Sequence, residues 1–263
     1  CSMEKTKPRI IAVINEKGGV GKTVTVINLA AALARADQQV LVVDMDPQAN
    51  STLGLGIELA DSDTSTYDLI IDPTKADPLA AIRKSDWKGL DIIPSHVDLS
   101  GAEVELVDRV GRENSLKQAL ASLNDNYDFI LVDTPPSLSL LTVNVLSYTN
   151  EVIIPCQTHP YAFVALSELF DTIGAVQAEI NPDLKITGLV ATFFDSRTRV
   201  SSSILDKLKR DECTKEILFD TVIRTNTTIA DSAFVGKPVV FYRTTSYGAL
   251  DYIRLADEVM GRN

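Results

Sequence analysis

Short apolar runs alternate with helical patterns along the 263-residue chain. Brief apolar stretches between turn signals are typical of buried parallel strands, and apolar residues spaced three and four apart are typical of helices. Strands are predicted at residues 9–15, 40–43, 90–93, 129–132, 152–154 and 185–190. Helices are predicted at residues 24–35, 97–110, 115–123, 161–180, 200–210 and 247–260. This alternation predicts an α/β fold: a single doubly wound domain with a mostly parallel central sheet flanked by helices on both faces.

Length and composition favour one globular unit. We expect residues 4–263 to form one domain, and residues 1–3 to be a foreign Cys-Ser remnant followed by the initiator Met3. No apolar run approaches the ~20 residues of a membrane helix, and the chain start lacks the apolar core of a signal peptide. Cys156 and Cys213 are expected to be reduced thiols, as in a cytoplasmic protein.

The charge of −11 is unevenly distributed. Residues 185–263 contain 12 Lys and Arg against 10 Asp and Glu, whereas residues 1–184 contain 13 basic and 26 acidic residues. The last third is therefore the part of the chain in which a basic, nucleic-acid-binding face is expected. Ordinary solvated surface charge is the alternative.

A glycine-rich segment between the first predicted strand and helix has the pattern of a phosphate-binding loop. The usual first glycine is replaced by Glu16, and Lys17 adds a second lysine to the loop. Glycines allow the backbone N–H groups to approach phosphate oxygens, and the following helix directs its N-terminus at them. A lysine and a hydroxyl at the end of the loop are expected to contact the β- and γ-phosphates and Mg²⁺. The expected phosphate contacts are Lys17, Gly18, Gly19, Val20, Gly21, Lys22 and Thr23.

Three aspartates end apolar strands. Asp44 and Asp46 follow the second strand, and Asp133 follows the fourth. Ligands of open α/β sheets bind at the carboxyl ends of strands, and phosphoryl transfer needs carboxylates that hold Mg²⁺ and orient water. A turn-capping role is the alternative for Asp44 and Asp46.

These residues together resemble the ParA/Soj branch of the deviant-Walker P-loop ATPases. The resemblance rests on three segments, Lys17-Gly-Gly-Val-Gly-Lys-Thr23, Asp44-Met-Asp-Pro-Gln-Ala-Asn50 and Asp133-Thr-Pro-Pro-Ser137, and it extends over nearly the whole chain. It implies ATP and Mg²⁺ as cofactors and an ATPase that is weak without its partner.

The resemblance also implies roles for individual residues. Lys17 would reach the nucleotide of a second subunit, so that ATP binding produces a homodimer, and Lys22 would be the second catalytic lysine. Asp46 would orient the attacking water. Thr23, Asp44 and Asp133 would contact Mg²⁺ or its coordination shell. Val24 stands where relatives commonly have threonine, and its backbone N–H is expected to contact the nucleotide, as is Asn226.

DNA binding is expected from the resemblance, but the sequence departs from it at residues 223–228. Relatives typically read Ile-Pro-Arg-Asn-Val-Arg there, and their two arginines are associated with non-specific DNA binding. Thr225 and Thr228 occupy those positions. Other basic residues of the last third would have to bind phosphates in their place. These candidates are Arg197, Arg199, Lys207, Lys209, Arg210, Arg224, Arg243 and Arg254.

The resemblance predicts a positioning ATPase of the cytoplasm and nucleoid, which segregates plasmid or chromosomal DNA with a ParB-like adaptor that stimulates hydrolysis. Positioning of a protein cargo on the nucleoid is one alternative. A membrane-surface ATPase of the MinD type is another, although residues 247–260 carry three acids and one base and are not a basic amphipathic helix. An iron–sulfur component, which by analogy needs cysteines near this motif, is excluded because the Asp133 motif runs into Thr-Pro-Pro-Ser with no cysteine nearby.

Overall fold

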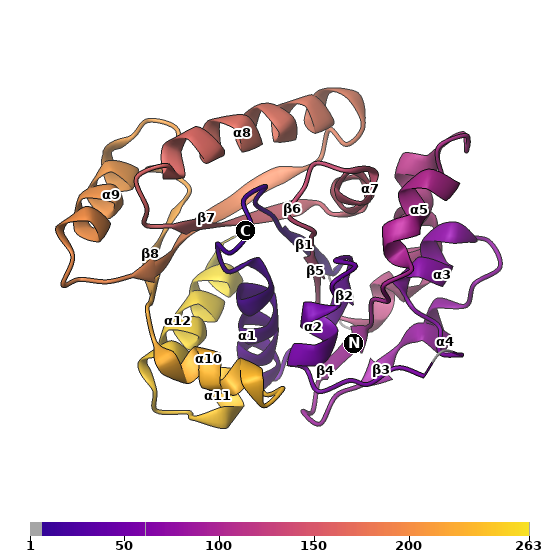
Figure 1. The fold of residues 1–263 in the computed structure, drawn as a ribbon, viewed down its shortest axis with the longest axis horizontal. Coiled ribbons are helices and arrows are strands. Elements are labelled where there is room, and N and C mark those ends of the chain that lie inside the picture. The colour runs from indigo at the N-terminus through magenta and orange to yellow at the C-terminus, as the bar shows by residue number, and fades with distance from the viewer. Residues whose placement is uncertain (1–6, 61, 263) are drawn as a thin grey trace, which may run out of the picture.

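The computed structural model describes residues 7–60 and 62–262. The expected remnant at residues 1–3 lies outside the described residues, and the single-domain assignment of residues 4–263 stays a prediction. The described chain is built around one eight-stranded sheet with the order β3-β4-β2-β5-β1-β6-β7-β8 (Figure 1). All neighbouring strands are parallel except β3, which runs antiparallel to β4 at one edge.

The strands follow the apolar runs of the sequence. They are β1 (Arg9–Val13), β2 (Val40–Asp44), β3 (Arg83–Lys84), β4 (Leu90–Ile93), β5 (Phe129–Asp133), β6 (Glu151–Gln157), β7 (Lys185–Phe194) and β8 (Leu218–Arg224). β1 lies between β5 and β6, and β2 lies between β4 and β5. The carboxyl ends of β1, β2 and β5 therefore meet at one edge of the sheet.

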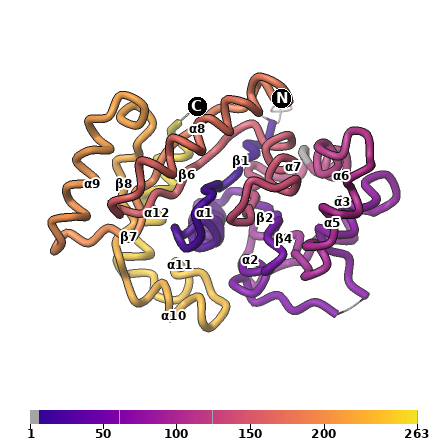
Figure 2. Tube along the Cα trace, turned by 45° about the horizontal axis from the view of Figure 1, so that its top comes forward, coloured from indigo at the N-terminus to yellow at the C-terminus, as the bar shows by residue number. Residues whose placement is uncertain are grey.

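Helices cover both faces of the sheet (Figures 1 and 2). The longer ones are α1 (Lys22–Arg35), α7 (Leu140–Tyr148), α8 (Ala162–Glu179), α9 (Arg199–Arg210), α10 (Thr227–Phe234) and α12 (Tyr247–Gly261). The shorter ones are α2 (Asn50–Gly54), α3 (Thr66–Ile71), α4 (Pro78–Ala81), α5 (Leu99–Glu105), η1 (Arg112–Asn114), α6 (Ser115–Leu120), η2 (Ala121–Asn126) and α11 (Val239–Tyr242).

Alternate residues of the parallel strands supply two separate cores. Ile10 and Ala12 of β1 belong to a core that includes residues of α3, α5, α6, α7, α8 and α9. Ile11 and Val13 belong to the opposite core, with α1, α11 and α12. A parallel strand between two helical layers is apolar on both sides, and this explains why the strands read as continuous apolar runs. The expected doubly wound fold is confirmed.

Two expected elements differ from the structure. The helix expected at residues 97–110 is only Leu99–Glu105, because residues 106–111 form turns that end at Gly111 with φ +73°. The strand expected at residues 9–15 ends at Val13, and Asn15 begins the phosphate loop. β8 and the two-residue β3 were not predicted. In the described part of the chain, no helix is both long and apolar enough to cross a membrane.

Candidate nucleotide site

The glycine-rich loop is held in place by Asn15, which follows the end of β1. Its side-chain Oδ1 accepts the N–H of Lys17 at 3.0 Å, and its Nδ2 donates to the carbonyl of Pro155 at 2.8 Å. Gly19 and Gly21 have φ values of +75° and +92°, which side-chain-bearing residues rarely adopt. α1 starts directly after Gly21, so the loop carries its backbone N–H groups into the N-terminus of a 14-residue helix.

Lys22 is buried although it carries a charge. Its side chain folds over the loop, and Nζ donates to the carbonyl oxygen of Lys17 at 3.3 Å. Burial lowers the pKa of Lys22, and the charges of Asp133 and Asp46 partly offset this effect. A buried ammonium on a glycine-rich loop is suited to a polyanionic ligand, which would replace the hydration that the lysine has lost.

The structure brings Asp44 and Asp133 together, since they are register partners at the ends of β2 and β5. Both are fully buried. Asp44 Oδ2 accepts the hydroxyl and the N–H of Thr52 at 2.8 and 2.9 Å, and Oδ1 accepts the N–H of Asp46 at 3.1 Å. Burial, together with the charge of Asp133, raises the pKa of Asp44 to about 7 against the opposing effect of the hydrogen bonds from Thr52.

One carboxylate oxygen of Asp133 makes no hydrogen bond within the described residues. Oδ2 accepts the hydroxyl of Ser51 at 2.8 Å, whereas the buried Oδ1 has no hydrogen-bond partner within the described residues. Burial raises the pKa of Asp133 to about 6, although the hydroxyls of Ser51 and Thr23 lower it. An unsatisfied carboxylate oxygen near a threonine hydroxyl fits Mg²⁺ or one of its water ligands, because Mg²⁺ prefers oxygen donors and keeps several waters.

Asp46 lies on the loop that leaves β2, and 6% of its surface is exposed. Its Oδ1 accepts the N–H of Gln48 at 3.0 Å, and its charge acts on Lys22 and Asp133. Ala49, three residues later, has φ +52°, an unfavourable value for alanine. The loop that carries Asp46 is therefore fixed by local hydrogen bonds but contains a strained residue where α2 begins.

An apolar cavity of about 340 Å³ adjoins the loop. Gly21, Val24 and Asn226 line it, together with Phe193, whose ring lies about 3.4 Å from the position that a Cβ on Gly21 would take. Asn226 caps α10 by accepting the N–H of Thr228 at 2.8 Å through Oδ1, and this fixes its side chain at the cavity. The structure thus places the expected nucleotide contacts Val24 and Asn226 on one side of the phosphate loop.

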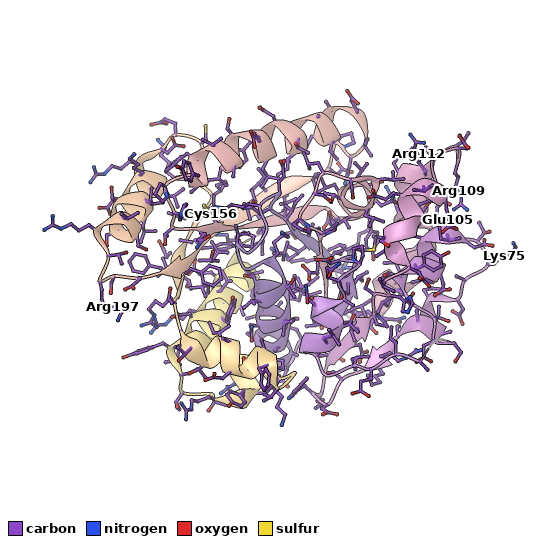
Figure 3. The ribbon with its side chains drawn as sticks, viewed as in Figure 1. Lys75, Glu105, Arg109, Arg112, Cys156 and Arg197 are labelled. Carbon is purple, nitrogen blue, oxygen red and sulfur yellow. The ribbon has the colours of Figure 1, made fainter. Side chains whose placement is uncertain are left out.

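The expected DNA contacts lie at the end of the sheet formed by β7 and β8. Arg199, Lys207, Lys209 and Arg210 are exposed on α9, and Arg243 is exposed after α11. Arg197 lies far from Glu105, Arg109 and Arg112, which belong to the opposite end of the molecule (Figure 3). Arg197 also forms an ion pair with Asp195 at 2.9 Å.

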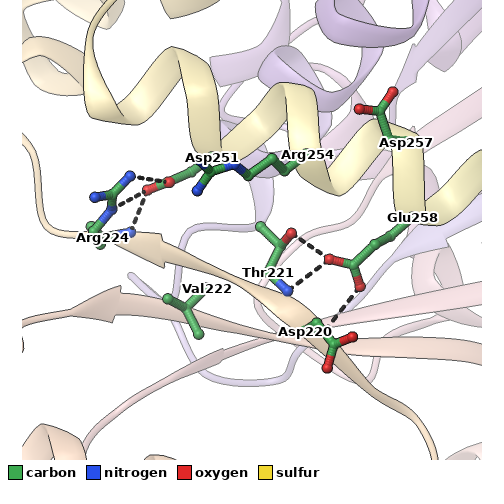
Figure 4. Close-up of a pocket in the computed structure, with 8 residues that line it drawn as sticks. All are labelled: Asp220, Thr221, Val222, Arg224, Asp251, Arg254, Asp257 and Glu258. Carbon is green, nitrogen blue, oxygen red and sulfur yellow. Dashed lines mark hydrogen bonds and ion pairs between the residues drawn. The ribbon is translucent and has the colours of Figure 1, made fainter.

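Arg224 and Arg254 lie in a cavity of about 570 Å³ between β8 and α12 (Figure 4). Arg224 is held by the buried Asp251 at 2.5 Å and lies 4.2 Å from the centre of the Tyr247 ring. Asp220, Asp257 and Glu258 share the cavity with Arg254. The acidic groups around these two arginines partly neutralise their charge.

Comparison with known proteins agrees with this site. A family model described as an AAA domain matches residues 8–186. The sporulation initiation inhibitor protein Soj of Bacillus subtilis is 43% identical over 95% of this chain and 98% of its own length. The chain belongs to the ParA/Soj family of P-loop ATPases.

Two further relatives extend the comparison. The chromosome partitioning protein ParA of Myxococcus xanthus is 40% identical over 98% of this chain and 90% of its own. A structure of cobyrinic acid a,c-diamide synthase from Mycobacterium smegmatis, with bound ATP analogue and magnesium, has a TM-score of 0.81 and 36% identity over 95% of this chain and 93% of that chain. The fold and the partitioning-ATPase class expected from the sequence are confirmed, while the roles of single residues stay predictions.

The sequence motifs did not identify the residues that support the site. Ser51 and Thr52 bind the two buried carboxylates, and Thr192 donates to the carbonyl of Val20 in the loop at 2.9 Å. Serine and threonine are common in loops and caps, so no spacing in one sequence distinguishes these residues from others. Only the pairing of β2 with β5 and the position of α2 show their role.

Proposed function

We propose that this protein is an ATPase that dimerises on ATP, binds DNA without sequence preference in that state, and positions or segregates DNA with an adaptor that stimulates hydrolysis. The site, with buried Lys22, paired Asp44 and Asp133, and the unsatisfied Asp133 oxygen, supports ATP and Mg²⁺ as its ligands. Magnesium would neutralise phosphate charge there. Thr23 and Asp133 would hold the ion, and Asp44 would support them from the next position outward. Asp46 is proposed to orient the attacking water.

The proposed dimer rests on one observation: the loop contains a second lysine, Lys17, in addition to the Lys22 that serves the site of the same subunit. Lys17 is half-exposed, and no ion pair of its ammonium occurs in the described part of the chain. Lys22 already lies within the loop of the same subunit. Lys17 is therefore available to the nucleotide of a second subunit, in the manner of an arginine finger supplied in trans.

ATP-dependent pairing would also produce a usable DNA site. One subunit offers a few exposed cations on α9 and near α11, and a dimer offers twice that number to one duplex. Linked weak sites bind far more tightly than single ones when the geometry allows both to engage. We therefore place the protein in the cytoplasm on nucleoid DNA, with hydrolysis as the release step.

The test is DNA binding with ATP, ADP or no nucleotide across a range of salt, for the wild type and Lys17→Ala. Binding is expected only with ATP, with a steep salt dependence, and at least tenfold weaker in Lys17→Ala because the dimer is lost. Asp46→Ala should bind DNA with ATP but not turn ATP over. Equal binding of DNA in all nucleotide states would contradict the switch, and normal turnover in Asp46→Ala would contradict its assigned role.

A further inference from the structure

Buried hydroxyl groups connect the phosphate loop to α9. Thr192 of β7 donates its hydroxyl to the carbonyl of Val20 in the loop at 2.9 Å. The backbone N–H of Thr158, which follows β6, donates to the carbonyl of Thr192 at 3.2 Å. The hydroxyl of Thr158 lies 2.7 Å from that of Ser201 on α9. Thr158, Thr192 and Ser201 expose only 8%, 2% and 4% of their surfaces, so these contacts are made inside the protein.

The hydroxyls of Thr158 and Ser201 can each donate and accept one bond. Ser201 Oγ accepts the N–H of Asp195 at 3.0 Å, and its own hydroxyl can donate to Thr158. Thr158 Oγ1 can then donate to the carbonyl of Phe193 at 3.4 Å or to that of Thr192 at 3.5 Å. A hydroxyl has one donor and two acceptor positions, so this arrangement is allowed for both residues. Removal of either hydroxyl leaves a buried partner unsatisfied.

Phe193 has a strained backbone beside the nucleotide site. Its φ of +50° is unfavourable for a residue with a side chain. Its ring lines the apolar cavity next to the phosphate loop, and 40% of its surface is exposed. Gly21 and Asn226 line the same cavity. A nucleotide that enters the cavity would therefore contact a residue whose unfavourable conformation is kept by its surroundings, including the bond from Thr158.

The residues that follow Phe193 lead directly into α9. Asp195 forms the ion pair with Arg197 and donates its N–H to Ser201. Thr198 caps α9, since its hydroxyl oxygen accepts the N–H of Ser201 at 3.3 Å. A change in the backbone of Phe193 would therefore move the start of α9, and with it the exposed cations of that helix.

We propose that Thr158 and Ser201 form a hydroxyl relay, which transmits the presence of a bound nucleotide from the phosphate loop and Phe193 to α9. Thr158 is thus a positioning residue, because it acts through α9. The proposal rests on the proposed function: it adds a second control of the DNA site, within each subunit, to ATP-dependent dimerisation. Each ligand can bias α9 only if the two positions of the helix differ in nucleotide affinity, so the relay is a coupling between two sites.

The test is hydrogen exchange at residues 195–205 of the full chain, without nucleotide and with ADP or ATP and Mg²⁺. ADP is the informative ligand, because the proposed dimer forms only with ATP and a response to ADP therefore arises within one subunit. Thr158→Val removes the hydroxyl and keeps the β-branched shape, Thr158→Ser restores a hydroxyl, and Ser201→Ala breaks the relay at its other member.

Thr214→Val is the matched control. Thr214 is 1% exposed, and it donates its hydroxyl to the carbonyl of Leu208 on α9 at 2.7 Å. The control therefore removes a buried hydroxyl that bonds the same helix but lies outside the relay. ATP affinity checks that every variant is folded, sedimentation measures ATP-dependent dimerisation, and the anisotropy of a fluorescent DNA duplex measures DNA affinity.

Either nucleotide should slow exchange at residues 195–205 in the wild type, Thr158→Ser and Thr214→Val. Thr158→Val and Ser201→Ala should lose this response, although they bind ATP and dimerise like the wild type. With ATP they should bind the duplex more weakly by roughly fivefold or more, which is the lower end of typical coupling between two sites.

A response to ADP that persists in Thr158→Val, or that is absent from the wild type, would overturn the relay and leave the proposed function intact. Equal losses in Thr214→Val would also overturn it, because any loosening of α9 would then have the same effect. A wild type that binds DNA equally in all nucleotide states would overturn the proposed function, whereas a response to ADP that Thr158→Val abolishes would still support the relay.

Discussion

At the scale of single residues, Asp133 shows how a carboxylate is prepared for a cation. It is fully buried, Ser51 satisfies one of its oxygens, and the other lacks a partner within the described residues. Burial raises its pKa to about 6. A buried carboxylate oxygen without a hydrogen bond is costly, and a bound cation would offset that cost.

This cost predicts a pH dependence of the ligand-free protein. Because the folded pKa of Asp133 is above the ordinary value of 3.8, its contribution to stability is complete below pH ~4 and is lost as the pH rises through 6. In the presence of a metal chelator, the unfolding free energy of Asp133→Asn should therefore decrease less between pH 4 and pH 7 than that of the wild type. It should stabilise the protein at pH 8 by roughly 1–3 kcal/mol, because its amide carries no charge.

Urea unfolding across that pH range measures the effect, with the same variant assayed for Mg²⁺-dependent turnover. Activity should fall at least tenfold while stability rises. A variant that is less stable at pH 8 than the wild type would show that the carboxylate charge is already compensated in the ligand-free fold.

The functional residues divide into those that the sequence reveals and those that only the fold reveals. Lys22 and Asp133 follow apolar strands in patterns whose chemistry is specific, so their position could be predicted. The role of Thr52 depends on α2 returning to the end of β2, and that return is a tertiary contact without a local pattern.

At the scale of elements, β8 is an edge strand whose outer N–H groups are covered by a helix. Glu258 of α12 accepts the N–H groups of Asp220 and Thr221 at 2.9 and 2.7 Å, and it also accepts the Thr221 hydroxyl. Asp251 accepts the N–H of Arg224 at 3.1 Å. Figure 4 shows these bonds between the strand and the helix. Unpaired edges invite pairing with other chains, and α12 prevents this here.

Glu258→Ala should weaken this protection. It leaves two N–H groups and one hydroxyl without acceptors, so the unfolding free energy should fall by about 1–3 kcal/mol, and the uncovered edge should promote self-association. Urea unfolding and light scattering measure the two effects. Asp257→Ala is the control, because it removes the same charge from the adjacent position of the same cavity. Equal losses in both variants would attribute the effect to charge instead of to the strand edge.

The elements that the sequence predicted are those with strong, uniform patterns. β1, β2, β5 and α8 are long apolar runs or sustained helical spacing inside the two cores. β8 was missed because Asp220 and Thr221 interrupt its apolar run. The helix expected to reach residue 110 stops at Glu105, because the apolar Val107 and Val110 are exposed and do not pack.

At the scale of the whole molecule, charge separates along the sheet. Residues 36–74 and 89–108 contain 13 Asp and Glu and neither Lys nor Arg, and they carry β2 and β4 near one end of the strand order. The more basic last third begins with β7 and β8 at the other end. Figure 1 shows α3 to α5 and α9 at these opposite ends. The two ends therefore differ in the sign of their charge, and an electrostatic ligand of either sign has a distinct end of the molecule to contact.

This separation makes the two ends distinguishable by charge reversal. Lys207→Glu/Lys209→Glu should weaken ATP-dependent DNA binding at least tenfold, and it should make the dependence of log affinity on log salt shallower by roughly 2 to 4, since each lost phosphate contact removes about 0.9. Lys75→Glu/Lys84→Glu makes the same charge change at the other end, where the two lysines are 83% and 80% exposed. That control should keep the wild-type slope, because the slope counts contacted phosphates and not net charge. Equal weakening by both pairs, with unchanged slopes, would mean that DNA responds to total charge and that α9 does not touch it.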